Sequence, residues 1–291
     1  MEIKNVGILG AGTLGSRVAL QAAISGYQVG IFDIQEKALS NSFQVMKGIL
    51  LQLEKTEKIQ EPTEKILSRV LFTSAMEKAI LQADIINESV TEDLDVKLEV
   101  WRKIGEIAPN HTLFTTNTSY LLPSQLAEAS GRPEKFCALH FHDVFYARVI
   151  DIMPHSATDP DLIPILERFG KSLNQVPVLV KKENPGYIFN SMLIALIGAA
   201  GKLLTGEVAS LEDIDRSWMV NFHLPMGPFG ILDSIGLDTA WLVTKARKDS
   251  ASQAFAGLLK TYIDQGKLGE KSGAGFYHYP NPEYKKPNFL I

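Results

Sequence analysis

Three glycines near the start of the chain have the spacing of a loop that binds phosphate groups. Gly10, Gly12 and Gly15 follow the apolar residues 6–9 and precede a run of small and apolar residues. Gly10 allows a sharp turn from strand to helix, Gly12 lets a pyrophosphate approach the backbone, and Gly15 lets the helix lie close on a sheet. N–H groups at the start of that helix would bind the pyrophosphate. The spacing therefore predicts a dinucleotide site formed by Gly10, Gly12, Thr13, Leu14 and Gly15.

An acidic residue closes the second predicted strand and indicates which dinucleotide binds. The Asp33 carboxylate can accept hydrogen bonds from the adenosine ribose hydroxyls. It favours NAD and would repel the additional phosphate of NADP, although the nearby Lys37 leaves some use of NADP open. A glycine triplet alone occurs by chance in many proteins, but here the flanking strands, the helix and the acid all fit. We therefore predict NAD as the cofactor.

Histidine is a suitable base for oxidising an alcohol with a nicotinamide cofactor, because it titrates near neutral pH and can take the hydroxyl proton. His140 lies near the end of a predicted strand, where ligands bind in open α/β sheets. His142, two residues on and on the same strand face, competes for this role. Asp151 is an acid within an apolar strand and needs a polar partner, which a histidine could supply. Of the remaining histidines, His111 precedes a predicted strand, and His155, His223 and His278 lie outside the predicted crevice.

Two further polar segments follow predicted strands, at residues 87–92 and 115–119. Ser119 and Asn117 in the second segment are residue types that often serve as turn and cap residues. Glu92 and Lys97 could equally form a solvated pair on a helix. A functional and a purely structural interpretation of these four side chains therefore both stay open.

The pattern around these residues predicts a Rossmann-type α/β fold. After the first strand-helix-strand unit, residues 35–68 are rich in helix formers and are broken by Pro62, which predicts an excursion of two helices. Strands are expected at 70–72, 84–87, 112–115, 135–141, 148–153 and 175–180, and helices at 94–108, 121–129 and 162–172. Such alternation indicates a doubly wound parallel sheet.

The periodicity becomes helical after Asn184-Pro185-Gly186, and helices are expected at 188–204, 211–220, 231–244 and 254–263. We therefore expect an NAD-binding domain over residues 1–183, followed by an all-α domain for substrate binding and dimerisation over residues 184–291. The small residues 198–201 would suit close packing of one helix on another, within the chain or across a dimer.

The composition is that of a soluble globular protein, with 291 residues, 45% hydrophobic and 21% charged. A net charge of −4 offers no broad basic surface, so nucleic acid is not an expected partner. Cys137 is the only cysteine, which excludes a disulfide framework within the chain, and no metal site is expected. The longest apolar stretch is too short to cross a bilayer, and the first residues lack a basic and apolar leader, so a cytoplasmic location is expected.

Several motifs spread over nearly the whole chain together resemble the L-3-hydroxyacyl-CoA dehydrogenases, including bacterial 3-hydroxybutyryl-CoA dehydrogenases. Besides the glycine loop they are Asn117-Thr118-Ser119, Leu139-His140-Phe141, the segments 184–190, 225–229 and 233–239, and Gly273-Ala274-Gly275-Phe276-Tyr277. The resemblance implies an NAD-dependent oxidoreductase that interconverts a 3-hydroxy and a 3-keto compound. A short-chain 3-hydroxyacyl-CoA is the expected substrate, and a homodimer joined through the helical domains is the expected assembly.

The resemblance also implies roles for individual residues. His140 would be the general base, Asp151 its acidic partner, and Ser119 and Asn190 the groups that bind substrate oxygens. Glu92, Lys97 and Asn117 would surround the nicotinamide end of NAD. The helical excursion around Lys55 and Lys58 would lie near the CoA moiety, and Lys47 and Lys65 belong to the same excursion.

The chain departs from the family pattern next to the expected base. The family usually continues His-Phe with Phe-Asn-Pro, whereas this chain has His142-Asp143-Val144, and the usual glutamate partner is Asp151. Aspartate is shorter by one C–C bond, about 1.5 Å. Either a strand shift brings Asp151 to His140, or Asp143 supports the ring instead. Because this segment would line the substrate crevice, two alternatives remain: a dehydrogenase of a free hydroxy acid such as L-gulonate, and an NAD-binding protein without turnover.

Overall fold

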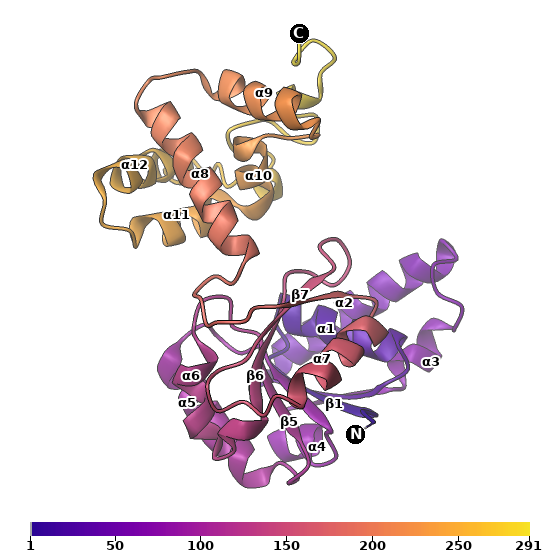
Figure 1. The fold of residues 1–291 in the computed structure, drawn as a ribbon. Helices are drawn as coiled ribbons and strands as arrows, with labels where there is room; N and C mark the ends of the chain where they lie inside the picture. Colours follow the sequence, from indigo (N-terminus) through magenta and orange to yellow (C-terminus); the bar gives the residue numbers. More distant parts are fainter. Residues whose placement is uncertain (1) are drawn as a thin grey trace. The chain divides into compact units, whose positions relative to one another are not determined.

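A computed structural model describes residues 2–291, and the chain divides into two compact units between Ile188 and Phe189. The expected boundary, after residue 183, lies just before the Asn184-Pro185-Gly186 turn, whereas the first unit continues through this turn. Figure 1 shows strands only in the first unit.

The first unit is built on one eight-stranded sheet with the strand order β3-β2-β1-β4-β5-β6-β7-β8. Its strands are β1 (Asn5–Leu9), β2 (Gln28–Phe32), β3 (Val70–Thr73), β4 (Ile85–Glu88), β5 (Leu113–Thr116), β6 (Phe136–Phe141), β7 (Val149–Met153) and β8 (Val176–Leu179). The order reverses direction at β1 and β4, which places a ligand crevice at the carboxyl ends of these strands. The doubly wound sheet expected from the sequence is confirmed.

One pair of strands departs from the parallel arrangement, because β7 runs antiparallel to β6. The two strands are joined by residues 142–148 alone, and a parallel connection needs a crossover of a dozen or more residues. The return is important for the site, because it pairs His140 directly with Asp151 in the register of the two strands.

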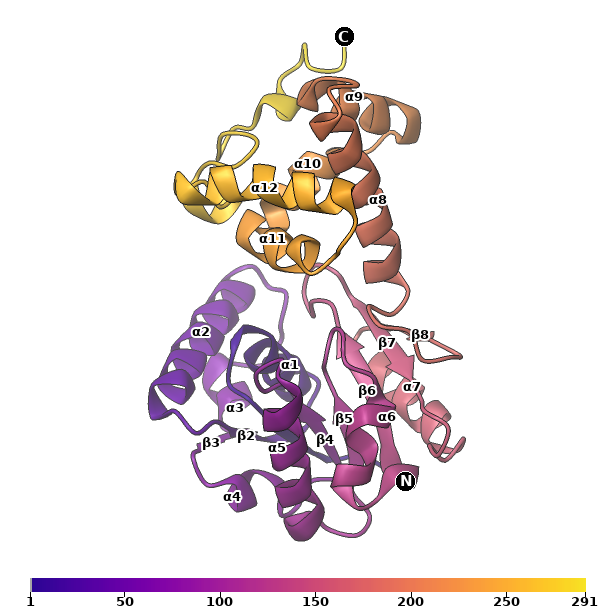
Figure 2. The same cartoon turned by 90° about the vertical axis from the view of Figure 1, so that its left-hand side faces the viewer.

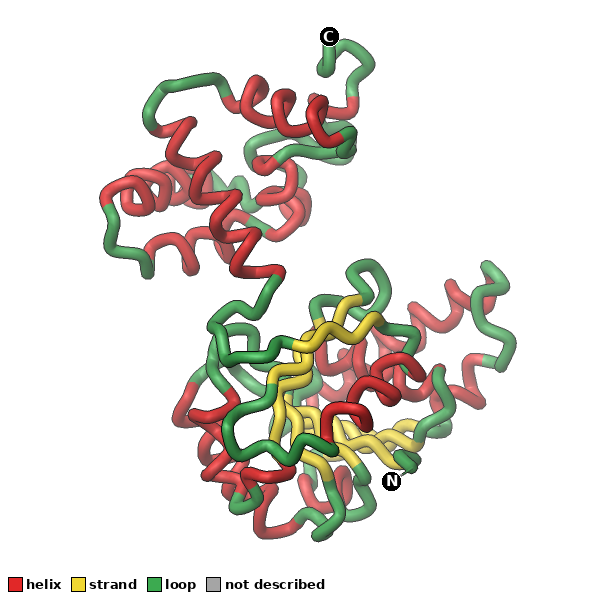
Figure 3. The backbone as a smooth tube through the Cα atoms, viewed as in Figure 1, coloured by secondary structure: helices red, strands yellow, loops and turns green. Residues whose placement is uncertain are grey.

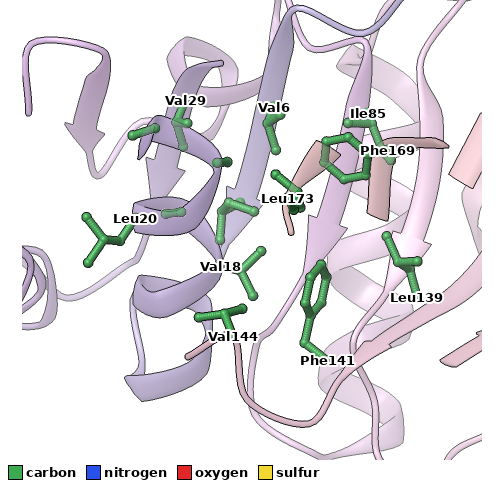
Figure 4. Packing of buried hydrophobic residues seen from close by; sticks show 14 of the residues in the cluster. Val6, Val18, Leu20, Val29, Ile85, Leu139, Phe141, Val144, Phe169 and Leu173 are labelled. Atoms are coloured by element: carbon green, nitrogen blue, oxygen red, sulfur yellow. The ribbon is translucent and has the colours of Figure 1, made fainter. Parts of the chain in front are cut away.

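Helices cover both faces of the sheet, and β-strand side chains alternate between the two hydrophobic layers. One face packs against α1 (Thr13–Ile24), α2 (Glu36–Lys55), α3 (Thr63–Leu67) and α7 (Leu162–Ser172). Figure 4 shows part of this layer, including Val18 of α1 and Phe169 of α7. The other face packs against α4 (Met76–Ile80), α5 (Leu94–Ile107) and α6 (Pro123–Leu126) around the fully buried Trp101. The expected two-helix excursion is present as α2, which lies beside β3, and α3, which packs against α2 (Figure 2).

The second unit is helical, as the tube in Figure 3 shows by colour. It consists of α8 (Phe189–Thr205), α9 (Leu211–Phe222), α10 (Pro228–Ile235), α11 (Leu237–Lys245) and α12 (Ser250–Asp264), followed by two 3-10 turns. The single helix expected over 231–244 was wrong, because Gly236 has φ of 103° and ends α10 before α11 begins. Phe229, Phe255, Leu259 and Tyr277 form the centre of a separate hydrophobic core.

Over residues 2–291, none of the helices combines the length and the apolar character that spanning a membrane requires.

Candidate active site

The glycine loop after β1 has the shape that a bound pyrophosphate needs. Gly10 has φ of +105°, and a Cβ there would lie 2.4 Å from the Ser89 carbonyl oxygen. A Cβ at Gly15 would lie 2.0 Å from the Gly10 carbonyl oxygen. By contrast, a Cβ at Gly12 would meet no atom within 4 Å in the described chain, so open space lies beside this backbone. Gly10 and Gly15 are therefore required by the fold itself, and Gly12 keeps space for a ligand.

The first turn of α1, which contains Thr13 and Leu14, borders this space and has backbone N–H groups that no side chain caps in the described chain. Gly12 is its N-cap, and among residues 2–291 no side chain caps the helix or places an acid in its first turn. Such a terminus leaves backbone N–H groups and a partial positive charge for an anion. Asp33 lies beside the loop, where Oδ2 accepts from the Ala11 N–H at 2.9 Å and Oδ1 from the Gln35 N–H at 2.9 Å. The residues present fit a dinucleotide.

His140 lies at the carboxyl end of β6, on the face opposite to Leu139 and Phe141. Its Nε2 is 3.2 Å from Ser119 Oγ, and its Nδ1 is 3.2 Å from Asp151 Oδ2. Burial lowers the pKa of His140 below its ordinary value, although the hydrogen bond to Asp151 acts in the opposite direction. The imidazole is thus neutral at pH 7, and its Nε2 is placed to receive a proton.

Asp151 accepts hydrogen bonds from two histidines through a single oxygen. Its Oδ2 is 3.2 Å from His140 Nδ1 and 2.8 Å from His142 Nε2. Burial raises the pKa of the Asp151 carboxyl, but the two histidines outweigh burial, and the pKa lies below its ordinary value. One polar atom from each of His140, His142 and Asp151 lies within 4.8 Å of the others, and the two hydrogen bonds to the carboxylate account for this closeness. Asp143, the other acid considered, forms an ion pair with Arg17 of α1.

A tyrosine that sequence reasoning missed completes the surroundings of His140. The Tyr187 ring stacks on the imidazole, with centroids 4.5 Å apart and planes 11° from parallel. Its hydroxyl donates to the Thr118 carbonyl at 2.7 Å, which ties the ring to the segment that carries Ser119. Burial raises the pKa of Tyr187, so the hydroxyl stays protonated. The aromatic residue after Pro185-Gly186 was visible in the sequence, but its contact with His140 was not.

Glu92 holds the loop that presents Ser119. Its Oε1 accepts from the Ser119 N–H at 3.0 Å, from the Tyr120 N–H at 3.1 Å and from the Thr118 hydroxyl. Its Oε2 is 3.3 Å from Lys97 Nζ. The four expected nicotinamide-side and oxygen-binding side chains of this unit, Glu92, Lys97, Asn117 and Ser119, therefore belong to one connected region.

Lys97 and Asn117 are built into the framework at the strand ends. Lys97 is 1% exposed and donates to Glu88 Oε1 at 2.6 Å, a buried acid that the sequence did not single out. Asn117 Oδ1 accepts from the Phe141 N–H at 2.8 Å, and its Nδ2 donates to Ser89 Oγ at 3.0 Å. The bonds of Asn117 join the carboxyl ends of β4, β5 and β6, and that of Lys97 joins α5 to the end of β4. Both residues therefore hold the strand ends together.

Asn190, the remaining expected substrate ligand, is the second residue of α8 in the helical unit. In the excursion of the first unit, Lys65 forms an ion pair with Glu61. Lys47, Lys55 and Lys58 are exposed, and none has a salt-bridge partner within the described chain. They remain available to an anionic ligand.

A dinucleotide loop and a histidine with a carboxylate partner, at the carboxyl edge of one doubly wound sheet, define an NAD-dependent dehydrogenase. Comparisons with known proteins identify the family. Residues 5–184 match the family described as 3-hydroxyacyl-CoA dehydrogenase, NAD binding domain, and residues 186–279 match 3-hydroxyacyl-CoA dehydrogenase, C-terminal domain. The chain therefore belongs to the 3-hydroxyacyl-CoA dehydrogenase family, and NAD is confirmed as the cofactor.

Relatives match over almost the full length. A probable 3-hydroxybutyryl-CoA dehydrogenase of Bacillus subtilis is 30% identical over 288 residues, 96% of this chain and 98% of that one. The solved structure of (S)-3-hydroxybutyryl-CoA dehydrogenase from Ralstonia eutropha has a TM-score of 0.84 at 29% identity, covering 96% of this chain and 99% of that one. A diketoreductase described as acting on dicarbonyl compounds has a TM-score of 0.91 at 38% identity, covering 96% of this chain and all of the other.

Proposed function

We propose that this dehydrogenase interconverts a short-chain 3-hydroxyacyl-CoA and its 3-ketoacyl-CoA, with His140 as general base and acid. The proposal is carried by the two hydrogen bonds of the His140 ring. Its Nε2 is 3.2 Å from Ser119 Oγ, and its Nδ1 is 3.2 Å from Asp151 Oδ2. A substrate hydroxyl seated beside Ser119 Oγ would lie within reach of His140 Nε2, which is the geometry a base requires.

The chain's own groups account for the proton. In the oxidative direction His140 Nε2 takes the proton of the substrate hydroxyl, and the Asp151 carboxylate stabilises the imidazolium that forms. Ser119 binds a substrate oxygen, and the role of Asn190 as a second oxygen-binding group rests on the family resemblance. Bound NAD supplies the acceptor for the hydride. In the reductive direction the His140 imidazolium returns the proton to the keto oxygen as it becomes a hydroxyl.

The cofactor would be held along the strand ends. The backbone of the glycine loop and the start of α1 would bind the pyrophosphate, and Asp33 the adenosine ribose. Glu92, Lys97 and Asn117 would border the nicotinamide end. The exposed lysines of the excursion, Lys47, Lys55 and Lys58, would meet the phosphates of CoA.

The test is the oxidation of NADH at 340 nm with acetoacetyl-CoA, run beside the free acid acetoacetate. We expect rapid turnover of the thioester and little with the free acid. His140→Ala should lower kcat by about 10²–10⁴ while the NADH dissociation constant stays nearly unchanged. An unchanged rate in this variant contradicts the assignment of His140, and turnover of the free acid alone contradicts the CoA substrate.

A second candidate substrate class has a specific observation in its favour. The diketoreductase is more similar to this chain than the CoA dehydrogenases named above, at 38% identity against 29–30%. A dicarbonyl compound without CoA would use the same His140 chemistry. The same assay with a small diketo ester, and NAD reduction with L-gulonate, distinguish these substrates from the thioester.

We also propose a homodimer formed through the helical unit. Large apolar side chains are exposed on its helices, among them Met192 at 60%, Phe222 at 61% and Leu242 at 56%. Exposed apolar groups of this size favour a partner surface. Sedimentation equilibrium should give twice the chain mass of 32.1 kDa, and Phe222→Glu should shift the equilibrium to monomer, whereas Leu81→Glu, also at an exposed apolar position but in the first unit, should not.

A further inference from the structure

His142 shares a carboxylate with the proposed base, and the strand geometry explains how. His140 and Asp151 are register partners on antiparallel β6 and β7, so their side chains stand directly opposite each other. The His142 N–H bonds the Val149 carbonyl, which continues this register by one pair. His142 is therefore the diagonal neighbour of Asp151 on the same face, close enough for a long side chain to reach it. The two ring centroids lie 4.8 Å apart.

The hydrogen-bonding groups allow only one arrangement of protons while the carboxylate is ionised. A carboxylate oxygen only accepts, so both nitrogens that face Asp151 Oδ2 carry hydrogens. In neutral His140 this places the hydrogen on Nδ1 and leaves Nε2 bare toward Ser119. In His142 it places a hydrogen on Nε2. The bond from His142 is the shorter of the two, 2.8 Å against 3.2 Å.

We propose that His142 is a positioning residue for the reaction: it fixes the short Asp151 side chain against His140 and takes a share of that carboxylate's negative charge. The proposal rests on the proposed role of His140. An aspartate reaches about 1.5 Å less far than a glutamate. A second donor on the same oxygen restrains the carboxylate where the longer acid would need no such help.

If His142 shares the negative charge of Asp151, the pKa of His140 should be lower than it would be without His142. The groups that face His140 are Asp151 on β7, His142 on its own strand, Glu92 after β4, Tyr187 before α8 and the Ser119 hydroxyl. Burial lowers the pKa of His140 most, Asp151 raises it, and the charge of His142 lowers it. Without His142, Asp151 would act on His140 alone, and the pKa of His140 would rise.

Two substitutions separate restraint from charge. His142→Phe keeps a ring of similar size and removes the donor, whereas His142→Gln keeps an N–H donor but cannot carry a charge. The pKa of His140 is measured by nitrogen-correlated NMR of the six histidines in the intact protein, with signals assigned from His140→Ala and His142→Phe. This readout needs no substrate, so it remains decisive if His140 is not the base.

In the wild type we expect a bare Nε2 on His140 and a protonated Nε2 on His142. In His142→Phe the pKa of His140 should rise by about half a unit to one unit, because a single charge partner acts over this range. The acidic limb of the kcat–pH profile for oxidation should move by the same amount, and kcat should fall on the order of 10-fold with KM unchanged. His142→Gln should recover most of kcat.

Restraint is tested further by Asp151→Glu. In the His142→Phe background the longer acid should raise kcat, whereas in the wild type it should lower kcat, so the two changes are not additive. Unchanged titration of His140 and unchanged kcat in His142→Phe overturn the proposal. A fall in kcat without a shift of the pH limb also overturns it, because packing alone would produce that result. Normal activity of His140→Ala contradicts the proposed function instead, and leaves the NMR result to decide whether the carboxylate is shared.

Discussion

Glu92 uses one carboxylate for two tasks: it holds the loop that carries Ser119, and it pairs with the positive charge of Lys97. Its two oxygens face in different directions, one toward the loop that carries Ser119 and the other toward Lys97. Lys97 in turn balances the buried Glu88, so the loop is linked through two ion pairs to the end of β4. The position of Ser119 Oγ beside His140 therefore depends on residues that need not touch the substrate.

Replacing Glu92 should separate these two contributions. Glu92→Ala removes the acceptor of the Ser119 and Tyr120 N–H groups, so the loop is released and kcat should fall by about 10²-fold, the effect of a misplacement near 1 Å. Glu92→Gln keeps one carbonyl oxygen as acceptor and loses only the charge facing Lys97, so kcat should fall less than about 10-fold. The measurement is steady-state kinetics at saturating NADH, with the NADH dissociation constant of each variant measured as well, because Glu92 would also border the nicotinamide end. Equal losses in the two variants would show that charge, and not the loop, is what matters.

At the residue scale, the sequence predicted side chains whose chemistry is evident from type and position, such as His140 after a strand and Asp33 at a strand end. It did not reveal what Tyr187 or Glu88 would contact. Their partners lie far along the chain, and only the paths of the backbone bring them together. The choice between Asp151 and Asp143 was likewise open, because it depends on the register of β6 and β7, which places Asp151 against His140 and Asp143 against Arg17.

At the scale of elements, the most demanding contact is the approach of α1 to the turn that follows β1. Gly12 has φ of −67° and ψ of −176°, which any residue can adopt, and it borders open space. Gly15 lies against the Gly10 carbonyl. Two glycines of one motif therefore have different tasks, one for the ligand and one for the packing of the helix.

Alanine at the two positions should give opposite results. Gly12→Ala should leave the urea midpoint unchanged and raise the NAD dissociation constant by at least about 10-fold, because the methyl group occupies the space of the pyrophosphate. Gly15→Ala should lower the free energy of unfolding by about 1–3 kcal/mol or more, because the methyl group overlaps a carbonyl oxygen. Gly48→Ala in α2 is the matched control, since its methyl group would meet nothing within 4 Å of the described chain. This substitution should raise the free energy of unfolding by about 0.5–1 kcal/mol and leave the NAD dissociation constant unchanged. If the Gly12→Ala variant binds NAD normally, the pyrophosphate does not bind at this loop.

Elements of strong periodicity were predicted well and short ones were not. The helix expected over 162–172 is α7, whereas the five-residue α4 was missed because so short a helix has little periodicity to detect. The split at Gly236 was missed because apolar spacing continues across it, and only the positive φ of that glycine breaks the helix. β7 runs antiparallel to β6 because the connection between them is too short for a crossover. The alternation of strands and helices along the chain did not predict this direction.

At the scale of the whole molecule, each unit has its own core and its own buried acids. In the helical unit, Asp215 accepts from the Phe229 and Gly230 N–H groups at the start of α10 and from the Tyr277 hydroxyl. A Cβ at Gly227 would lie 2.4 Å from the Asp215 carboxyl carbon. The motifs of this unit that carry the family resemblance thus surround a buried carboxyl group, in contrast to the histidine cluster of the first unit.

These groups give the two units opposite dependence on pH. Burial raises the pKa of Asp215 to about 6, so its contribution to the stability of the helical unit is fully present below the unfolded value of about 3.9 and is lost as pH rises through about 6. Burial lowers the pKa of His140 instead, so its contribution to the first unit is fully present above the unfolded value of about 6.5 and is lost as pH falls. Between pH 6.5 and 5, acidification should therefore weaken the first unit and strengthen the second.

Native-state hydrogen exchange read by mass spectrometry on the intact, NAD-free protein can follow both units in one experiment, because peptides report on each separately. From pH 6.5 to 5, after correction for intrinsic exchange rates, protection should fall in peptides of β6 and β7 and rise in peptides of α9 and α10. Asp215→Asn cannot ionise and keeps one carbonyl oxygen, which can accept from either the Phe229 or the Gly230 N–H, so it should remove the pH dependence of the helical unit, at some cost in stability, and leave that of the first unit intact. Protection that moves in the same direction in both units would contradict the assignment of these two groups, and a helical unit that keeps its slope in Asp215→Asn would place the titration at Asp233, whose pKa burial also raises.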